Sequence, residues 1–288
     1  MYKIVSTISE SGICLYSGEI SKLTLAPSLS EGIWFKNKYG LREKISPFSV
    51  VIENHNTSIV FKDGSRIKLI EHILSAIASM GISDIEISVD SDEIPLFDGS
   101  SLSYLMLLKE LTIVKKDSFE YAVLNKTIRI EEGDFFVEIS PSNKISYDFA
   151  IDFNHSLFGK ENFKFDFSTK KYESDIALAR TFGFIDDLSS VQSFFKGATL
   201  NNTIIISNNE LLSTFRIEKE LVRHKILDAI GDMRCFPYLM SFKYKSFGGS
   251  HKLNNLLLQK LYTEEGAFEV IKISEEKIEN FEFALSYV

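Results

Sequence analysis

The spacing of hydrophobic and polar residues changes several times along this chain, and each change predicts a different element. Residues 84–90 alternate strictly, with Ile85, Ile87 and Val89 on one side, which predicts a strand with one buried face. The Asp-Gly pair at 63–64 predicts a hairpin turn between two shorter strands. The strands predicted in the first half cover residues 22–25, 33–36, 58–61, 66–69 and 84–90.

Two segments of the first half have a helical pattern. Residues 70–80 predict a helix, and Gly81 stands where a glycine commonly ends one. Residues 102–111 predict a second helix. The stretch 114–121 that follows is polar and charged. We therefore expect a domain boundary there, with one α+β domain in residues 1–116 and another in residues 117–288.

The second half repeats this order of strands, helix, strand and helix without repeating the sequence. Its strands come in runs, and no Gly-x-Gly-x-x-Gly segment follows a strand, so a parallel doubly wound sheet is disfavoured. The pattern predicts an α+β fold in which mainly antiparallel sheets pack on helices. The predicted strands are 127–130, 135–139, 145–153 and 239–242, and the predicted helices are 173–179, 217–232 and 253–262.

Composition narrows the class of protein. The chain has 288 residues, of which 44% are hydrophobic and 25% charged, which is ordinary for a globular protein with one large or two medium domains. The 24 phenylalanines predict an aromatic-rich core and ligand pocket. A net charge of −8 disfavours a general nucleic-acid binder, although it leaves room for an anionic small ligand held by local cations.

Cysteine content and hydropathy indicate the compartment. The two cysteines, Cys14 and Cys235, sit beside apolar residues, and we expect them to be buried thiols rather than a disulfide framework. The N-terminal residues contain no continuous apolar stretch, and no run approaches the ~18 apolar residues of a membrane-spanning helix. We expect a cytoplasmic protein with no stable membrane insertion.

The run 223–232 carries the first candidate chemistry. His224 and Asp228 are four residues apart in a predicted helix, so their side chains share one face and could bind a single metal ion. Asp232 lies one turn further on, and Glu71-His72 supplies a second imidazole and a carboxylate from far upstream. Two His, one Asp and a separate Glu suit a hydrolytic zinc site with an open coordination position. A single His-x-x-x-Asp pair is more often a surface pair, and that interpretation stays open on spacing alone.

Seven stretches of the chain together resemble one family, the zinc-dependent UDP-3-O-acyl-N-acetylglucosamine deacetylases of lipid A biosynthesis. They occur in family order across nearly the whole chain, and the stretches around His224 and Thr181 are the most specific. The matching stretches are 12–18, 71–72, 93–100, 151–155, 179–184, 223–232 and 250–255.

The resemblance implies two similar domains, each a two-layer sandwich, with the active site between them. It implies that His72, His224 and Asp228 hold Zn²⁺ and that Glu71 is the general base. The other implied catalytic residues are Thr181, which hydrogen-bonds the oxyanion; His251, which acts as general acid or as a cation beside the developing charge; and Asp232, which orients His251.

The resemblance also implies how the substrate is recognised. Asp152 and Phe153 match the residues that meet the uracil, by hydrogen bond and by stacking. Lys225 matches a lysine of the sugar or phosphate region, and Phe182 stands beside Thr181 in a matching stretch as a further substrate-binding candidate. The residues 184–206 correspond to the insert that binds the acyl chain.

Two positions depart from the family pattern. Tyr16 stands where members usually carry a histidine near the metal, and Phe135 stands where a lysine helps to bind the diphosphate. We expect a monomeric zinc amidohydrolase that removes acetate from UDP-3-O-(3-hydroxyacyl)-N-acetylglucosamine, the committed step of lipid A biosynthesis. The alternatives are a divergent paralogue that binds acylated sugar nucleotides with little turnover, and a deacetylase of a related acyl sugar.

Overall fold

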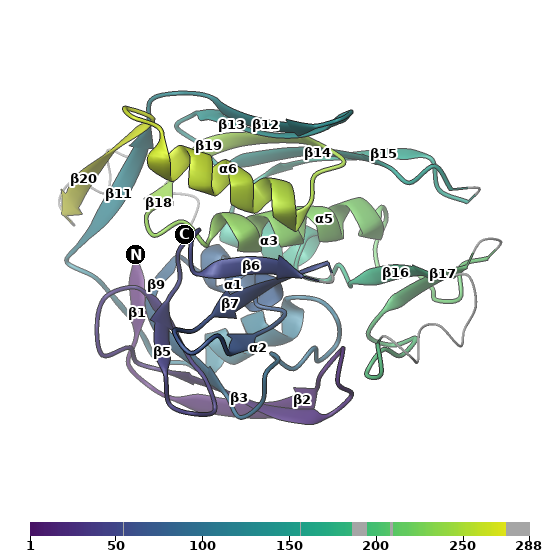
Figure 1. Ribbon diagram of the computed structural model, residues 1–288, viewed down its shortest axis with the longest axis horizontal. Coiled ribbons are helices and arrows are strands. Elements are labelled where there is room, and N and C mark those ends of the chain that lie inside the picture. Colours follow the sequence, from purple (N-terminus) through teal and green to yellow (C-terminus); the bar gives the residue numbers. More distant parts are fainter. Residues whose placement is uncertain (54, 156, 186–194, 208–209, 275–288) are drawn as a thin grey trace.

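Sheets lie on the outside of the molecule and helices lie between them (Figure 1). The computed structural model describes residues 1–53, 55–155, 157–185, 195–207 and 210–274. From the top of Figure 1 downward, a five-stranded sheet is followed by α5 and α6, then by α1 and α2, then by a seven-stranded sheet. Most strand pairs are antiparallel. The predicted α+β fold of helices packed on mainly antiparallel sheets is confirmed.

The seven-stranded sheet is formed by the first half of the chain. Its central strand is β9, in which Ile85 and Ile87 are fully buried, as the alternating pattern predicted. Helix α1 packs on this strand and on α2. The elements of this layer are β1 (Tyr2–Ile4), β2 (Ile8–Ile13), β3 (Ile20–Ala26), β4 (Ile33–Lys36), β5 (Arg42–Lys44), α1 (Glu71–Ser79), β9 (Ile82–Val89), α2 (Leu102–Glu110) and β10 (Ile113–Lys115).

A small sheet of the first half lies beside α1. Its middle strand is β7, and four of its five residues are buried. The carbonyl of Thr57 accepts a hydrogen bond from the N–H of Ile70 (3.1 Å), which joins this strand to the start of α1. The strands are β6 (Val50–Glu53), β7 (Asn56–Val60) and β8 (Arg66–Ile67).

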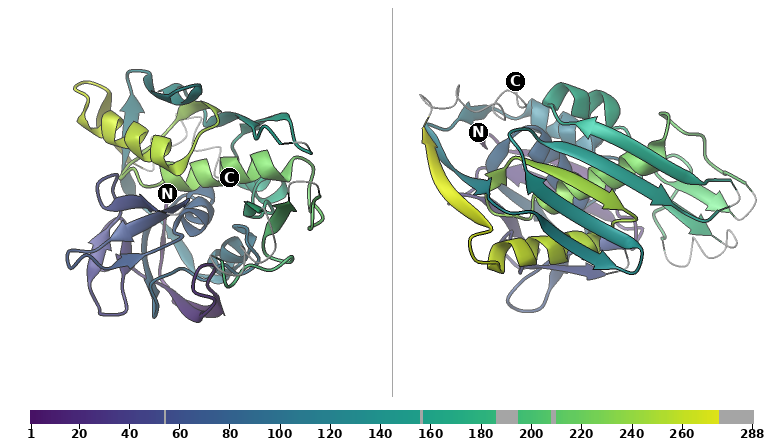
Figure 2. Two further views of the ribbon diagram at one scale, coloured as in Figure 1. Left: turned by 45° about the vertical axis from the view of Figure 1, so that its right-hand side comes forward. Right: turned by 90° about the horizontal axis from the view of Figure 1, so that it is seen from above.

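The five-stranded sheet is formed by the second half, in the order β12-β13-β19-β14-β15. Helix α5 packs on β14 and β15, and α6 packs on β12 and β13. Figure 2, right, shows this sheet from above, covering the helices. The elements are β12 (Ile128–Glu132), β13 (Phe135–Pro141), β14 (Ser146–Asp152), β15 (Lys160–Asp166), α5 (Glu220–Met233), β19 (Phe242–Phe247) and α6 (His251–Thr263).

Two predicted elements are shifted or divided. The helix expected at 173–179 is α3 (Thr169–Asp175), which begins earlier because the Ser168 side chain caps it by accepting from the N–H of Lys171 (3.2 Å). The strand expected at 239–242 is divided into β18 (Leu239–Met240) and β19, which belong to different sheets. The remaining predicted elements appear within a few residues of their expected bounds.

Two further sheets lie at opposite ends of the molecule in Figure 1. The sheet β18-β11-β20 contains β11 (Ser118–Leu124) and β20 (Phe268–Ser274), and the parallel pair consists of β16 (Phe182–Ile185) and β17 (Ile204–Ser207). This pair flanks the expected acyl-chain insert, of which 186–194 lie outside the described residues. The division into domains 1–116 and 117–288 stays a prediction.

Helices α1 and α5 cross in the centre of the molecule and bring the predicted metal ligands together. They pack directly on one another, and Figure 2, left, shows α5 directly above the layer that contains α1. The approach is close at Gly231, where an added Cβ would lie 2.0 Å from the carbonyl oxygen of Glu71. Only glycine permits two backbones to come this near.

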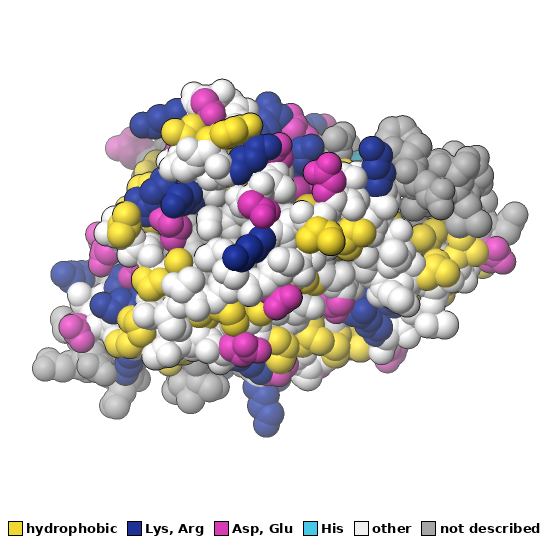
Figure 3. Space-filling view, turned by 90° about the horizontal axis from the view of Figure 1, so that it is seen from below, with side chains coloured by type: hydrophobic (Ala, Val, Ile, Leu, Met, Phe, Trp, Pro, Cys, Tyr) yellow, Lys and Arg dark blue, Asp and Glu magenta, His cyan; other side chains and the backbone are white. Residues whose placement is uncertain are grey.

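The surface carries charges of both signs. Figure 3 shows Lys and Arg interspersed with Asp and Glu on the face seen from below. This view therefore offers no basic stripe of the kind that nucleic-acid binding requires. Within the part of the chain that the structure describes, no helix combines the length and apolar character needed to cross a membrane.

Candidate metal centre

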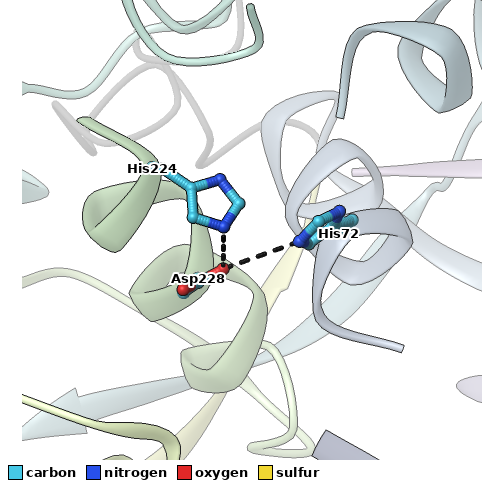
Figure 4. Close-up of side chains that lie close together, drawn as sticks. All are labelled: His72, His224 and Asp228. Atoms are coloured by element: carbon cyan, nitrogen blue, oxygen red, sulfur yellow. Dashed lines mark ion pairs between the residues drawn. The ribbon is translucent and has the colours of Figure 1, made fainter. Parts of the chain in front are cut away.

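Three side chains from two helices converge on one point (Figure 4). The donor atoms of His72, His224 and Asp228 all lie within 4.8 Å of one another. His224 Nε2 is 3.3 Å from Asp228 Oδ1, one helical turn away on α5, and His72 Nε2 reaches the same oxygen from α1 at 3.7 Å. All three are buried. The spacing of His224 and Asp228 along a helix thus does place both on one face.

The donor atoms of this cluster fit a cation. Asp228 Oδ1 is buried between the two imidazoles and has no hydrogen-bond partner among the described residues. Buried polar atoms are rarely left without a partner. His224 Nδ1 lies 3.1 Å from the carbonyl of Ala179, which as an acceptor fixes the proton on Nδ1 and leaves Nε2 as a ligand. Two imidazoles and one carboxylate are the donor set of a catalytic zinc site with an open position.

Burial and neighbouring charges set the protonation states of these three side chains. Burial lowers the pKa of His72 to about 3, assisted by His224, and burial also lowers the pKa of His224, so both imidazoles are neutral near pH 7. Burial opposes ionisation of Asp228, but the charge that His224 carries at the low pH where this carboxyl titrates, together with the Lys225 ammonium 2.9 Å from Oδ2, outweighs burial. They hold the pKa of the Asp228 carboxyl well below its usual range. Neutral imidazole and ionised carboxylate are the forms that bind metal.

Two groups that can carry protons face the cluster. His251 Nε2 lies 4.0 Å from Glu71 Oε1 and 3.8 Å from Asp228 Oδ2. Burial raises the pKa of Glu71 to about 8, partly opposed by the charge of His251. Burial lowers the pKa of His251, but Asp232, bonded to Nδ1 at 2.8 Å, outweighs burial and raises that pKa to about 9. A divalent cation beside Glu71 would lower its pKa and favour the base form.

A cavity of about 490 Å³ opens in front of the three donors. Thr181 lines it, and its backbone is fixed by donating to the carbonyl of Gly99 and accepting from the N–H of Ile204, both at 2.8 Å. The predicted site residues that line the cavity are Glu71, His72, Phe153, Thr181, Phe182, His224, Lys225, Asp228 and His251.

A row of aromatic rings begins beside His224 and continues along one wall of this cavity. The Phe182 ring is 5.8 Å from that of His224, and Phe153 is 5.4 Å from Phe182 and 4.9 Å from Phe184. The ammonium of Lys225 lies 5.2 Å from the centre of the Phe182 ring. A flat apolar group and an anion could therefore be bound side by side here.

Two predicted site residues stand outside this lining. Asp232 lies behind His251 and reaches the cavity only through it. Asp152 is half-buried at the end of β14, accepts from the N–H of Asn154 (3.0 Å) and lies 3.9 Å from the ammonium of Lys160. Phe135, which departs from the family pattern, packs against Phe247, with ring centres 6.1 Å apart.

The structure places two further residues at the site, Tyr16, which departs from the family pattern, and Thr57, which the sequence did not indicate. Tyr16 lines the cavity, packs against Phe195 (5.5 Å between ring centres) and accepts a hydrogen bond from Asn56 (2.9 Å). Thr57 contacts both Glu71 and Asp232. A threonine in a buried strand is ordinary, so no sequence signal could have identified it.

Comparisons with known proteins agree on one family. The family model described as "LpxC: UDP-3-O-acyl N-acetylglycosamine deacetylase" matches residues 2–263. The chain is 40% identical over 283 residues to the UDP-3-O-acyl-N-acetylglucosamine deacetylase of Helicobacter hepaticus, covering 96% of this chain and 93% of that protein. The same-named proteins of Helicobacter pylori and Aliarcobacter butzleri are 39% and 36% identical, covering 92% and 99% of this chain and 92% and 97% of their own lengths.

Proposed function

The chain belongs to the UDP-3-O-acyl-N-acetylglucosamine deacetylase family, and from this premise we propose that it is a zinc-dependent amidohydrolase. Its proposed reaction removes acetate from UDP-3-O-(3-hydroxyacyl)-N-acetylglucosamine, the committed step of lipid A biosynthesis. One observation carries the proposal: His72, His224 and Asp228 converge within 4.8 Å, with Glu71 and His251 facing them. Binding alone would not need this acid–base pair.

The resident metal would be held by His72, His224 and Asp228. Zinc in such a site polarises the amide carbonyl and lowers the pKa of a water to about 7. Lys225 neutralises the second oxygen of Asp228 (2.9 Å), which leaves Oδ1 for the ion.

The remaining groups would divide the acid–base work. Glu71, the first residue of α1, directs Oε1 toward His251 at 4.0 Å, and its carboxylate would accept a proton from the attacking water. His251, held protonated by Asp232, places positive charge near the developing oxyanion or donates a proton to the leaving amine. The Thr181 hydroxyl, at the cavity wall, donates to the oxyanion.

The cavity walls suit the two ends of such a substrate. Phe153 and Phe182 provide aromatic faces for the uracil side, with Asp152 beside them, and Lys225 provides a cation for the sugar or phosphate region. The segment 184–206 is proposed to bind the acyl chain. We further propose that the protein works as a monomer in the cytoplasm, which light scattering and cell fractionation test.

Acetate release from the acylated UDP-sugar tests the proposal directly. The zinc-loaded protein should release acetate, and the metal-depleted protein should not until zinc is restored. A panel of related acyl sugars separates the proposed substrate from its alternatives. Tight binding of the substrate by zinc-loaded protein without acetate release would favour the divergent binding protein instead.

A further inference from the structure

We propose that Thr57 is a positioning residue that fixes the two proton-carrying groups of this site, Glu71 and the His251–Asp232 pair, relative to one another. The effect of Thr57 on catalysis rests on the proposed deacetylase function. The structural part of the inference stands independently, because it concerns contacts within the protein. Thr57 does not line the cavity, so it would act through its partners.

The contacts of Thr57 reach both groups at once. Its side chain is 1% exposed, and its hydroxyl donates to Asp232 Oδ1 at 2.7 Å. The Thr57 hydroxyl oxygen, Oγ1, also lies 3.3 Å from His251 Nδ1. Its backbone N–H donates to Glu71 Oε2 at 3.1 Å. One residue of β7 therefore touches side chains from α1, α5 and α6.

The backbone of Thr57 brackets the first turn of α1. Its N–H binds the Glu71 carboxylate, and its carbonyl accepts from the N–H of Ile70 (3.1 Å), the residue before Glu71. With Oε2 held in this way, Oε1 is the carboxylate oxygen that faces His251. The strand thus sets the rotation of the proposed base.

The hydroxyl of Thr57 sets the orientation of Asp232. Oδ2 of this carboxylate accepts from His251 Nδ1 and from Asn254 Nδ2, both at 2.8 Å. Among the described residues, the Thr57 hydroxyl is the hydrogen-bond donor to Oδ1. Asn254 is itself held by the Tyr244 hydroxyl (2.8 Å). Loss of the Thr57 donor would leave Oδ1 buried and unpaired, and the carboxylate would rotate to recover a partner. His251 would then lose the bond that directs Nε2 toward Glu71.

A purely structural role makes a different prediction. A buried threonine hydroxyl that only satisfies its own hydrogen bond would contribute to stability and leave the rate unchanged. Ser79 provides that comparison, because it is fully buried in α1 and its hydroxyl donates to the carbonyl of Ala76 (2.8 Å), with no part in the cavity lining.

The test compares Thr57→Val, Thr57→Ser and Ser79→Ala in the zinc-loaded enzyme. Valine keeps the branched shape and the backbone N–H to Glu71, so it removes only the contacts of the hydroxyl with the His251–Asp232 pair. Outer partners that orient functional side chains typically account for about 10- to 100-fold in activity. We expect Thr57→Val to lower kcat by about that factor with KM little changed. Thr57→Ser should recover most of the loss, and Ser79→Ala should match the wild-type kcat.

A spectroscopic measurement separates this inference from the proposed function. The His251 Nδ1 proton bonded to Asp232 should give a downfield NMR resonance in the metal-free protein. It should persist in Thr57→Ser and broaden or shift in Thr57→Val. Thr57→Ala, measured in parallel, supplies the same loss if the valine variant does not fold. Failure of the wild-type protein to release acetate would defeat the deacetylase proposal, whereas an unchanged resonance in Thr57→Val would defeat the positioning role. Equal losses in the serine and valine variants would also defeat it.

Discussion

Replacing Gly231 with alanine tests whether the contact between α1 and α5 sets the metal site. In the structure, a Cβ at this position would lie 2.0 Å from the Glu71 carbonyl oxygen and 2.8 Å from its carbonyl carbon. Both are backbone atoms that no rotamer change can move. Ordinary contact begins at 3.4 Å, so relief at the oxygen requires a shift of about 1.4 Å, obtained by separating the helices.

These magnitudes predict that Gly231→Ala impairs metal binding and rate more than folding stability. Alanine in a helix interior gains about 1 kcal/mol over glycine, and overpacking costs about 1–3 kcal/mol, so the net loss of stability is at most about 2 kcal/mol. Metal ligands, in contrast, tolerate errors of about 0.2 Å. His72 would move with α1, away from His224 and Asp228 on α5. A misplacement of about 1 Å costs on the order of 100-fold in rate.

Zinc affinity measured by chelator competition, together with kcat and thermal unfolding, checks this prediction. We expect Gly231→Ala to remain folded while zinc affinity and kcat each fall by about 100-fold or more. Gly159→Ala is the matched control, because an added Cβ there would meet nothing within 4 Å. Wild-type zinc affinity in folded Gly231→Ala would refute the account of how the two helices position the ligands.

Three further predictions concern the metal, the base and a buried ion pair. Glu71→Gln should lower kcat by about 10²–10⁴-fold in steady-state assays while retaining zinc by elemental analysis, and near-wild-type turnover would exclude Glu71 as the base. Free zinc at 100 times its Kd should stabilise the metal-free protein by about 2.7 kcal/mol in thermal unfolding, and no shift would argue against a zinc site in the folded state. The side chain of Glu220 is 0% exposed, and its carboxylate lies 2.9 Å from Arg180 Nε. Arg180→Met removes this charge partner and should lower the free energy of unfolding, measured in urea, by about 3–5 kcal/mol. A loss below about 1 kcal/mol would contradict this prediction.

Most of the helices and strands could be predicted from the sequence, because the patterns that indicate them are local. Strict alternation at β9 and the helical spacing of His224 and Asp228 both survive in the structure, since burial of one face enforces each period. The helix predicted at 173–179 ends earlier than expected, at Asp175. Beyond it the i→i−4 pattern stops, because the N–H of Ala177 bonds to the carbonyl of Tyr172 and the N–H of Ala179 bonds to the carbonyl of Ile176.

The site depended on information that local patterns do not contain. Nothing in the spacing of Glu71-His72 shows that α1 crosses α5 at Gly231, and it was the family resemblance that joined the two segments. Thr57 was missed for a related reason. Its proposed role depends on contacts with side chains of three separate helices, while its own sequence surroundings are those of any buried strand residue.

Anomalous diffraction at the zinc absorption edge, from crystals of the zinc-loaded protein, tests the central claim most directly. We predict one strong peak about 2.0–2.2 Å from Nε2 of His72, Nε2 of His224 and a carboxylate oxygen of Asp228. The absence of a peak at that point, or a peak held by other residues, would contradict the assignment of these three side chains as the metal ligands.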